Sequence, residues 1–216
     1  MSKHAMKHTS ITLLTLTAAA GFAQSAPAAA SSFAVTGNVE VTSNYVFRGL
    51  TQSAGHSAIQ GGFDLAKTPI SGLTAGVWAS SLSAGTEADL YANYAFKVSA
   101  VDVSVGYIDY TYSVASANKT GAEANVAATY AGLTIKVSKG VSGALSDYYY
   151  EANYSYDIAA IKGLNLGLHY GSDRASKNND YGIALTYPIA GLDTSVSYTD
   201  IQKGSSITAF TVKKSF

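Results

Sequence analysis

From about Phe33 onward the chain alternates apolar and polar residues in one segment after another, and this feature most restricts its fold. Residues 101–107 give the pattern in its simplest form, with the order Val, Asp, Val, Ser, Val, Gly, Tyr. A period of two places successive side chains on opposite faces of a strand. Each segment therefore predicts a β-strand that lies between two different environments.

The alternation recurs in twelve segments of the chain. They are residues 35–48, 59–65, 73–80, 89–96, 101–107, 122–130, 133–138, 148–156, 164–170, 180–187, 192–198 and 208–216. Bacterial single-chain outer-membrane barrels have an even number of antiparallel strands. The prediction is an all-β fold, a transmembrane antiparallel up-and-down β-barrel of about 12 strands.

The connections between these segments alternate in length. Short turns recur at intervals of 28 to 32 residues, and most place a Gly-Leu pair at the start of the next strand. The pairs are Gly72–Leu73, Gly132–Leu133, Gly163–Leu164 and Gly191–Leu192, with Ala100–Val101 in the remaining position. Longer polar connections, such as 49–57 and 171–179, fall on the other side. Short periplasmic turns and longer external loops are typical of outer-membrane barrels, and they predict that both termini are periplasmic.

The first 30 residues have the pattern of a secretory signal peptide. Lys3 and Lys7 precede a short apolar run over 11–23, and small residues follow, with cleavage expected between about 23 and 30. An N-terminal membrane anchor is the alternative, but the apolar run is too short to span a bilayer. The remainder, 31–216, is expected to form one barrel domain with a net charge of −2 after cleavage.

A soluble β-sandwich also alternates, but its outer face should be rich in charged residues. Charged residues make up only 13% of this chain, and the polar positions are mainly Gly, Ser, Thr and Asn. The 16 tyrosines and 7 phenylalanines fall mostly at the two ends of the apolar faces, with aliphatic residues between them. High strand propensity alone would explain tyrosine in strands. Two aromatic bands around an aliphatic belt favour a barrel in lipid.

Several classes of function lack their sequence signals. The chain has no cysteine, no zinc-ligand spacing, no phosphate-binding loop and no basic block, so we expect no cofactor, no metal site and no nucleic-acid partner. After signal cleavage only His56 and His169 remain as histidines. His169 is predicted to face the lumen rather than lipid, and we expect no catalytic residue.

The stretch 43–53, SNYVFRGLTQS, resembles the opening motif of the TorF family of porin-like proteins. The likeness continues through 58–64 (AIQGGFD), 76–80 (GVWAS) and 87–91 (EADLY), so it covers about residues 38–95. The resemblance implies an outer-membrane barrel of a Gram-negative cell that acts as a porin in transport. It implies no catalytic residue and no defined solute.

These motif residues also suggest where the lumen narrows. On the predicted barrel, a group of inward side chains should lie at one level of four neighbouring strands, with the guanidinium opposite the carboxylates. The predicted constriction residues are Arg48, Gln60, Asp64, Trp78, Glu87 and Asp89. Such a ring selects solutes by charge, and an excess of inward acids over bases predicts a weak cation preference. The alternative is a salt-bridged plug that closes the lumen, as in a structural or adhesive barrel.

The expected partners follow from this location. They are outer-membrane lipid, small solutes or ions, and the barrel-assembly machinery, which would bind the last strand through its terminal Phe216. The sequence leaves the solute and the oligomeric state open.

Overall fold

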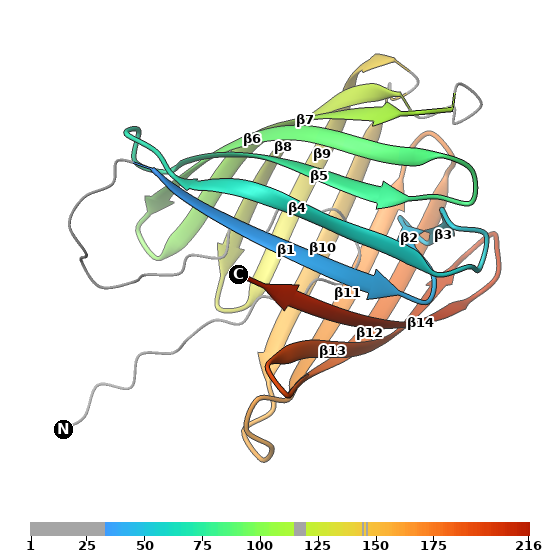
Figure 1. Ribbon diagram of the computed structural model, residues 1–216. Helices are drawn as coiled ribbons and strands as arrows, with labels where there is room; N and C mark the ends of the chain where they lie inside the picture. Colours follow the sequence, from blue (N-terminus) through green and yellow to red (C-terminus); the bar gives the residue numbers. More distant parts are fainter. Residues whose placement is uncertain (1–32, 115–119, 144, 146) are drawn as a thin grey trace.

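The computed structural model describes residues 33–114, 120–143, 145 and 147–216, and the predicted signal peptide lies outside them. These residues form a closed antiparallel barrel of twelve strands (Figure 1), which confirms the predicted fold class. The barrel strands are β1 (Ala34–Thr42), β4 (Ala58–Lys67), β5 (Leu73–Ser81), β6 (Thr86–Val98), β7 (Val101–Tyr112), β8 (Gly121–Tyr130), β9 (Leu133–Gly143), β10 (Tyr148–Asp157), β11 (Asn165–Asp173), β12 (Asn178–Ile189), β13 (Leu192–Ile201) and β14 (Ile207–Ser215). A separate hairpin is formed by β2 (Val46–Phe47) and β3 (Leu50–Thr51).

The barrel closes because its first and last strands pair. β1 pairs with β14 on one side and with β4 on the other, in both cases antiparallel. At the end of this seam, Gly37 N donates to Phe216 O at 2.8 Å and Phe216 N donates to Gly37 O at 3.0 Å. No strand of the described barrel is left with an unpaired edge, as a sheet in lipid requires.

Two-residue turns join β6 to β7, β8 to β9 and β12 to β13 at the end of the barrel that holds both termini, whereas residues 68–72 and 158–164 form longer connections there. Ala131 and Gly132 have φ values of 49° and 86°, and Ala190 and Gly191 have 52° and 77°. Two central residues with positive φ form the turn that matches the twist of a β-hairpin, and glycine adopts this conformation without strain. The turns fall where the Gly-Leu repeat predicts them, although β11 begins at Asn165, one residue after the predicted start.

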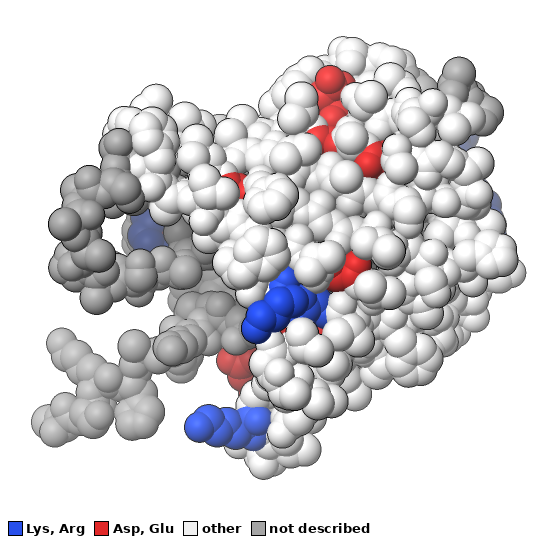
Figure 2. Space-filling view, in the orientation of Figure 1, with Lys and Arg blue, Asp and Glu red and all other residues white. Residues whose placement is uncertain are grey.

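The apolar side chains of the strands face outward, as the alternation predicts. Leu90, Val126, Ile183 and Phe210 are 64%, 46%, 46% and 63% exposed, respectively. On the face seen in Figure 2, uncharged atoms cover most of the surface and charged atoms form only small groups. A continuous apolar exterior is unfavourable in water and stable in lipid, so this belt is suited to a membrane environment.

Aromatic residues border the belt at both ends. Tyr148 and Tyr150 stack on β10 near the external loops, and Tyr154 and Tyr156 stack on the same strand nearer the tight turns.

Within the described ranges, no helix is long and apolar enough to cross a membrane.

One predicted strand is wrong in its length. The alternation over 35–48 predicted a single strand that ends at Arg48, with Tyr45 and Phe47 in the external aromatic band, but β1 ends at Thr42. Tyr45 is only 2% exposed, and its ring packs against Trp78 on β5, with 5.6 Å between centroids. The chain leaves the barrel wall after Thr42 and folds inward as the β2–β3 hairpin. Apolar and polar residues continue to alternate in this hairpin, so the sequence pattern does not show where β1 ends.

Candidate functional site

The candidate site is built around the segment between β1 and β4, which folds into the lumen. Figure 1 shows β2 and β3 at the end of the barrel where β1 ends and β4 begins. Arg48 and Gly49 form the turn of the hairpin, with φ values of 50° and 77°. Asn44 Oδ1 accepts hydrogen bonds from Thr51 Oγ1 at 2.6 Å and from Ser53 Oγ at 3.1 Å. These polar side chains hold the two ends of the hairpin together.

Arg48 joins this hairpin to the far wall of the barrel. Its Nη1 and Nη2 donate to Oε1 and Oε2 of Glu123 at 2.8 and 2.7 Å. Glu123 lies on β8, five places from β1 in the ring of twelve strands, so the ion pair crosses most of the lumen. Tyr110 donates a further hydrogen bond to Glu123 Oε2 at 3.0 Å.

The ion pair is buried and has aromatic cover. The side chains of Arg48 and Glu123 are 14% and 3% exposed, and the guanidinium carbon lies 4.1 Å from the centroid of the Tyr149 ring. Burial opposes the charge of Arg48, but the Glu123 carboxylate outweighs it and raises the pKa of the guanidinium above its ordinary value. Arg48 therefore stays charged and acts as a bidentate clamp.

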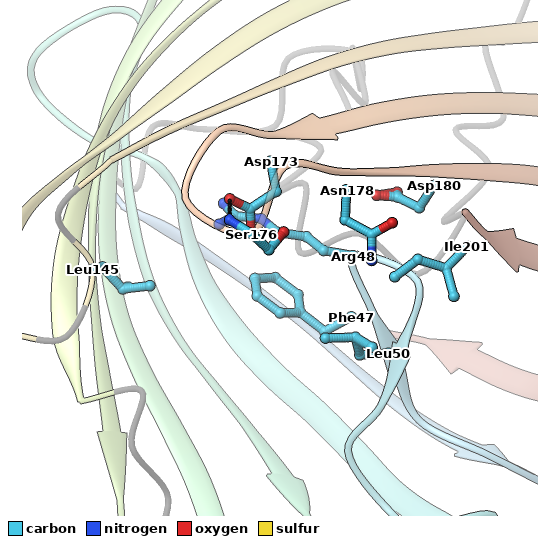
Figure 3. Close-up of a pocket in the computed structure, with 9 residues that line it drawn as sticks. All are labelled: Phe47, Arg48, Leu50, Leu145, Asp173, Ser176, Asn178, Asp180 and Ile201. Atoms are coloured by element: carbon cyan, nitrogen blue, oxygen red, sulfur yellow. Dashed lines mark hydrogen bonds between the residues drawn. The ribbon is translucent and has the colours of Figure 1, made fainter. Parts of the chain in front are cut away.

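The turn of the hairpin also packs against the wall formed by β12 and β13. A Cβ atom added to Gly49 would lie 2.8 Å from Asp180 Cβ and 3.0 Å from Ile201 Cβ, so only glycine fits there. Beside it is a cavity of about 140 Å³, in which Phe47 and Leu50 lie between Leu145 on one side and Ile201 on the other (Figure 3). This packing fixes the hairpin on a second side.

A polar network covers the wall from β9 to β12. Tyr149 Oη donates to the Asp180 carboxylate at 2.9 Å, and His169 Nε2 lies 2.9 Å from Asp180 Oδ2. On the adjacent strands, Lys136 Nζ pairs with Glu151 Oε1 at 3.0 Å. The acids of this wall therefore have basic or hydroxyl partners, as buried charges require.

The opposite wall, formed by β4 to β6, holds five of the six predicted constriction residues, and four of these lie near its external end. Gln60 lies opposite Ser80 and Ser80 opposite Glu87, while Trp78 lies opposite Asp89 in the next row. Gln60 Nε2 donates to Ser80 Oγ at 3.0 Å. These four residues lie in two adjacent rows near the external end of the wall.

The other two predicted residues lie elsewhere. Asp64 is farther along β4 toward the tight turns, where Tyr91 Oη donates to its Oδ1 at 2.5 Å. The prediction that Arg48 ends the first strand is wrong, because the hairpin carries it across the lumen, where its ion-pair partner is Glu123.

Sequence reasoning missed that Glu123, Tyr110 and Tyr149 form the partner site of Arg48. The alternation of residues 122–130 indicates only that Glu123 faces inward, and no local pattern distinguishes the two tyrosines. The Arg48–Gly49 pair between β-forming residues was a usable turn signal. Its meaning depends on where the turn docks, which a local pattern does not contain.

Toward the tight turns the lumen wall changes character. Beside larger or buried inward residues such as Tyr91 and Asn165, the wall there includes eight that are small and half-buried. They are Gly62, Gly76, Ser104, Gly106, Ala127, Gly182, Ser195 and Ser197. At the level of the hairpin, by contrast, Tyr45, Tyr110 and Tyr149 are 2–3% exposed.

A closed twelve-stranded barrel with an apolar exterior and a polar interior is an outer-membrane β-barrel of the porin-like class. Residues 26–216 match the model of one bacterial family, Gcw_chp, which is described as a bacterial protein of unknown function. The chain belongs to this family.

Solved structures show the same fold at low sequence identity. A KdgM porin has a TM-score of 0.59 and 10% identity, over 84% of this chain and 97% of the porin. A KdgM porin in complex with disordered oligogalacturonate has a TM-score of 0.55 and 11% identity, over the same shares of the two chains. No curated protein sequence matches the chain significantly.

Proposed function

We propose that the protein is an outer-membrane pore for passive diffusion of small solutes or ions, with its constriction at the β2–β3 hairpin. The observation that carries this proposal is the hairpin held across the lumen by Arg48 and Glu123, above a wall of small half-buried residues. An eight-stranded barrel is just wide enough to be filled by its own side chains, whereas twelve strands enclose a wider interior. Small residues on that interior leave room for water and solute.

The charge of the constriction supports a weak preference for cations. Arg48 and Lys136 are neutralised by Glu123 and Glu151, so they add little positive field. In the cation-free barrel, Glu87 and Asp89 then place two acidic side chains on the β6 side of the same level. Acidic side chains at a constriction favour cations over anions.

The same charges distinguish this lumen from one suited to acidic sugars. The KdgM porin is recorded with oligogalacturonate, a chain of sugar carboxylates. The acidic β6 wall would repel such a polyanion, so we propose neutral or cationic small solutes for this pore. The resemblance of residues 43–53 to the TorF family supports the same general role.

A second candidate is a closed structural barrel, and the buried Arg48–Glu123 pair favours it by filling the lumen with a rigid contact. Liposome swelling with neutral sugars of graded size distinguishes the two functions. The pore predicts size-dependent swelling faster than in protein-free liposomes. Swelling equal to that of protein-free liposomes would refute the pore.

Ion preference requires a separate measurement. Single-channel recording across a KCl gradient should give a reversal potential on the cation side, and an anion-selective potential would refute the charge argument. We propose no enzymatic role, because the hydrogen-bond partners of His169 in the described chain are Asn153, Tyr149 and Asp180, with no serine among them.

A further inference from the structure

Asp89 is a fully buried carboxylate without a hydrogen-bond partner. It lies on β6, facing the lumen, and is 0% exposed. Neither Oδ1 nor Oδ2 accepts a hydrogen bond from any residue that the structure describes. A buried, unpaired carboxylate is costly, because it has lost water and gained no compensating donor or cation.

Two further oxygen atoms on this wall are in the same condition. Tyr45 and Gln60 are each 2% exposed, and neither Tyr45 Oη nor Gln60 Oε1 has a hydrogen-bond partner within residues 33–114, 120–143, 145 and 147–216. Gln60 uses its amide nitrogen on Ser80, which leaves the carbonyl oxygen available.

The residues that carry these oxygens lie on two adjacent rows of the β4–β6 wall or, for Tyr45, against it. Trp78 contacts the Tyr45 ring and lies opposite Asp89 in the sheet, while Ser80 contacts Gln60 and lies opposite Glu87. Burial and the nearby Glu87 and Asp89 carboxylates raise the pKa of the Tyr45 hydroxyl well above its ordinary value. Through its ring contact with Trp78, which lies opposite Asp89, Tyr45 packs against the same row of the wall as this carboxylate.

The cluster offers only oxygen ligands and two carboxylates. Its nearest lumen cation on the hairpin, Arg48, is bonded to Glu123 instead. Hard divalent cations are bound by oxygen, and Ca²⁺ accepts carboxylate, carbonyl and water oxygens in flexible geometry, whereas Mg²⁺ requires a near-ideal octahedron. In the described part of the chain, no group of three or more His, Cys, Asp or Glu gathers as a metal site. An ion here would thus depend on Gln60 and Tyr45 in addition to the two acids.

We propose that Asp89, Glu87, Gln60 and Tyr45 form a binding site for a Ca²⁺-type divalent cation between the β4–β6 wall and the hairpin. The sequence predicted no metal site, because two acids two residues apart on a strand form no recognised motif. The site goes beyond the proposed pore function and does not depend on an open lumen. The cation compensates the buried charge of Asp89 and ties Tyr45 to the wall, opposite the Arg48–Glu123 contact.

The test uses the full-length barrel, refolded in detergent micelles and stripped with EDTA, and the probe is CaCl₂. We expect saturable binding by isothermal titration calorimetry and a rise in the thermal unfolding temperature. Asp89→Asn should weaken Ca²⁺ binding at least about tenfold, because the number of charged ligands sets the affinity of such sites. The matched control is Asp102→Asn, which removes a lumen acid at the other end of the barrel, paired with Lys97. It should bind Ca²⁺ as the wild type does.

A crossover in stability separates a binding site from a structural role. In EDTA, Asp89→Asn should unfold at a higher temperature than wild type, because it lacks a buried charge, whereas in Ca²⁺ the order should reverse. Absence of Ca²⁺ binding to wild type, or equal stabilisation by KCl at matched ionic strength, would overturn the proposal. If Asp89→Asn does not fold, Tyr45→Phe keeps the ring contact with Trp78 and removes one ligand. Unchanged Ca²⁺ affinity in Tyr45→Phe would also overturn the proposed site.

Discussion

Replacing Arg48 with alanine should release the hairpin from the far wall and widen the pore. Arg48→Ala removes both hydrogen bonds to Glu123, at 2.8 and 2.7 Å, and the contact with the Tyr149 ring. It also leaves the buried Glu123, 3% exposed, with the Tyr110 hydroxyl as a hydrogen-bond donor but without its cationic partner. The docked hairpin then holds a buried carboxylate whose charge is no longer balanced.

The size of the effect follows from this burial. Removing one partner of a buried ion pair costs about 3–5 kcal/mol. We expect about 3 kcal/mol here, because undocking the hairpin lets water reach Glu123 and relieves part of the penalty. Since 1.4 kcal/mol corresponds to a tenfold change, the undocked population should rise roughly a hundredfold.

Planar-bilayer recording provides the assay. Arg48→Ala should show a larger single-channel conductance, or frequent openings to a larger level, and should admit larger sugars in liposome swelling. Arg48→Lys is the matched control, since it keeps the charge but not the bidentate geometry. Its conductance should lie between those of the wild type and Arg48→Ala. Glu123→Gln and the double variant complete a cycle that isolates the coupling between the two residues.

One pattern of results would contradict this reasoning. If Arg48→Ala keeps the wild-type conductance and size limit, and the cycle gives a coupling energy near zero, the ion pair does not hold the constriction. Heat-modifiable migration on SDS gels, checked for each variant, ensures that only folded barrels are compared.

Three further predictions test the hairpin contact, the lipid belt and the closing seam. Gly49→Ala should lower the free energy of hairpin docking by about 1–3 kcal/mol, because φ at residue 49 is 77° and the new Cβ would clash with Asp180. The single-channel conductance should therefore rise. An unchanged conductance would count against the docked turn. Val126→Arg, on the lipid face of β8, should destabilise the barrel by about 2–4 kcal/mol in urea titrations in lipid vesicles, whereas Val126→Leu should not. Deleting Phe216 removes two backbone hydrogen bonds to Gly37 and the proposed assembly signal, so less folded barrel should reach the outer membrane. Phe216→Ala keeps the backbone hydrogen bonds and should cause a smaller loss. Equal losses in the two variants would attribute the effect to the aromatic ring alone.

Most of the barrel could be predicted from the sequence because its rules are local. Alternation along a strand, such as 101–107, depends only on which face meets lipid, and the strand that contains it was predicted from its start at Val101. The turn at Gly132 could be predicted because positive φ favours glycine. Strand ends were less certain, since β7 continues to Tyr112, beyond the clear alternation.

The site was predicted only in part, for a reason seen in two sets of residues. One set comes together because consecutive antiparallel strands pair in a fixed register, and the length of each connecting turn allows this register to be predicted. Its members are Gln60, Trp78, Glu87 and Asp89. Arg48 could not be placed in this way. Its position depends on a loop that leaves the wall, and β-alternation continues through that loop as it does through the strand.

The sequence by itself determined the twelve strands, their lipid and lumen faces, and the end of the barrel that holds the short turns. The physical reason is that each of these depends on solvent preference and backbone propensity over a few residues. Only the tertiary structure decided that residues 43–53 fold inward, that Arg48 crosses to Glu123, and that Asp89 is buried without a donor. These contacts join residues up to 75 positions apart, and they exist only after barrel closure brings opposite walls within reach of one side chain.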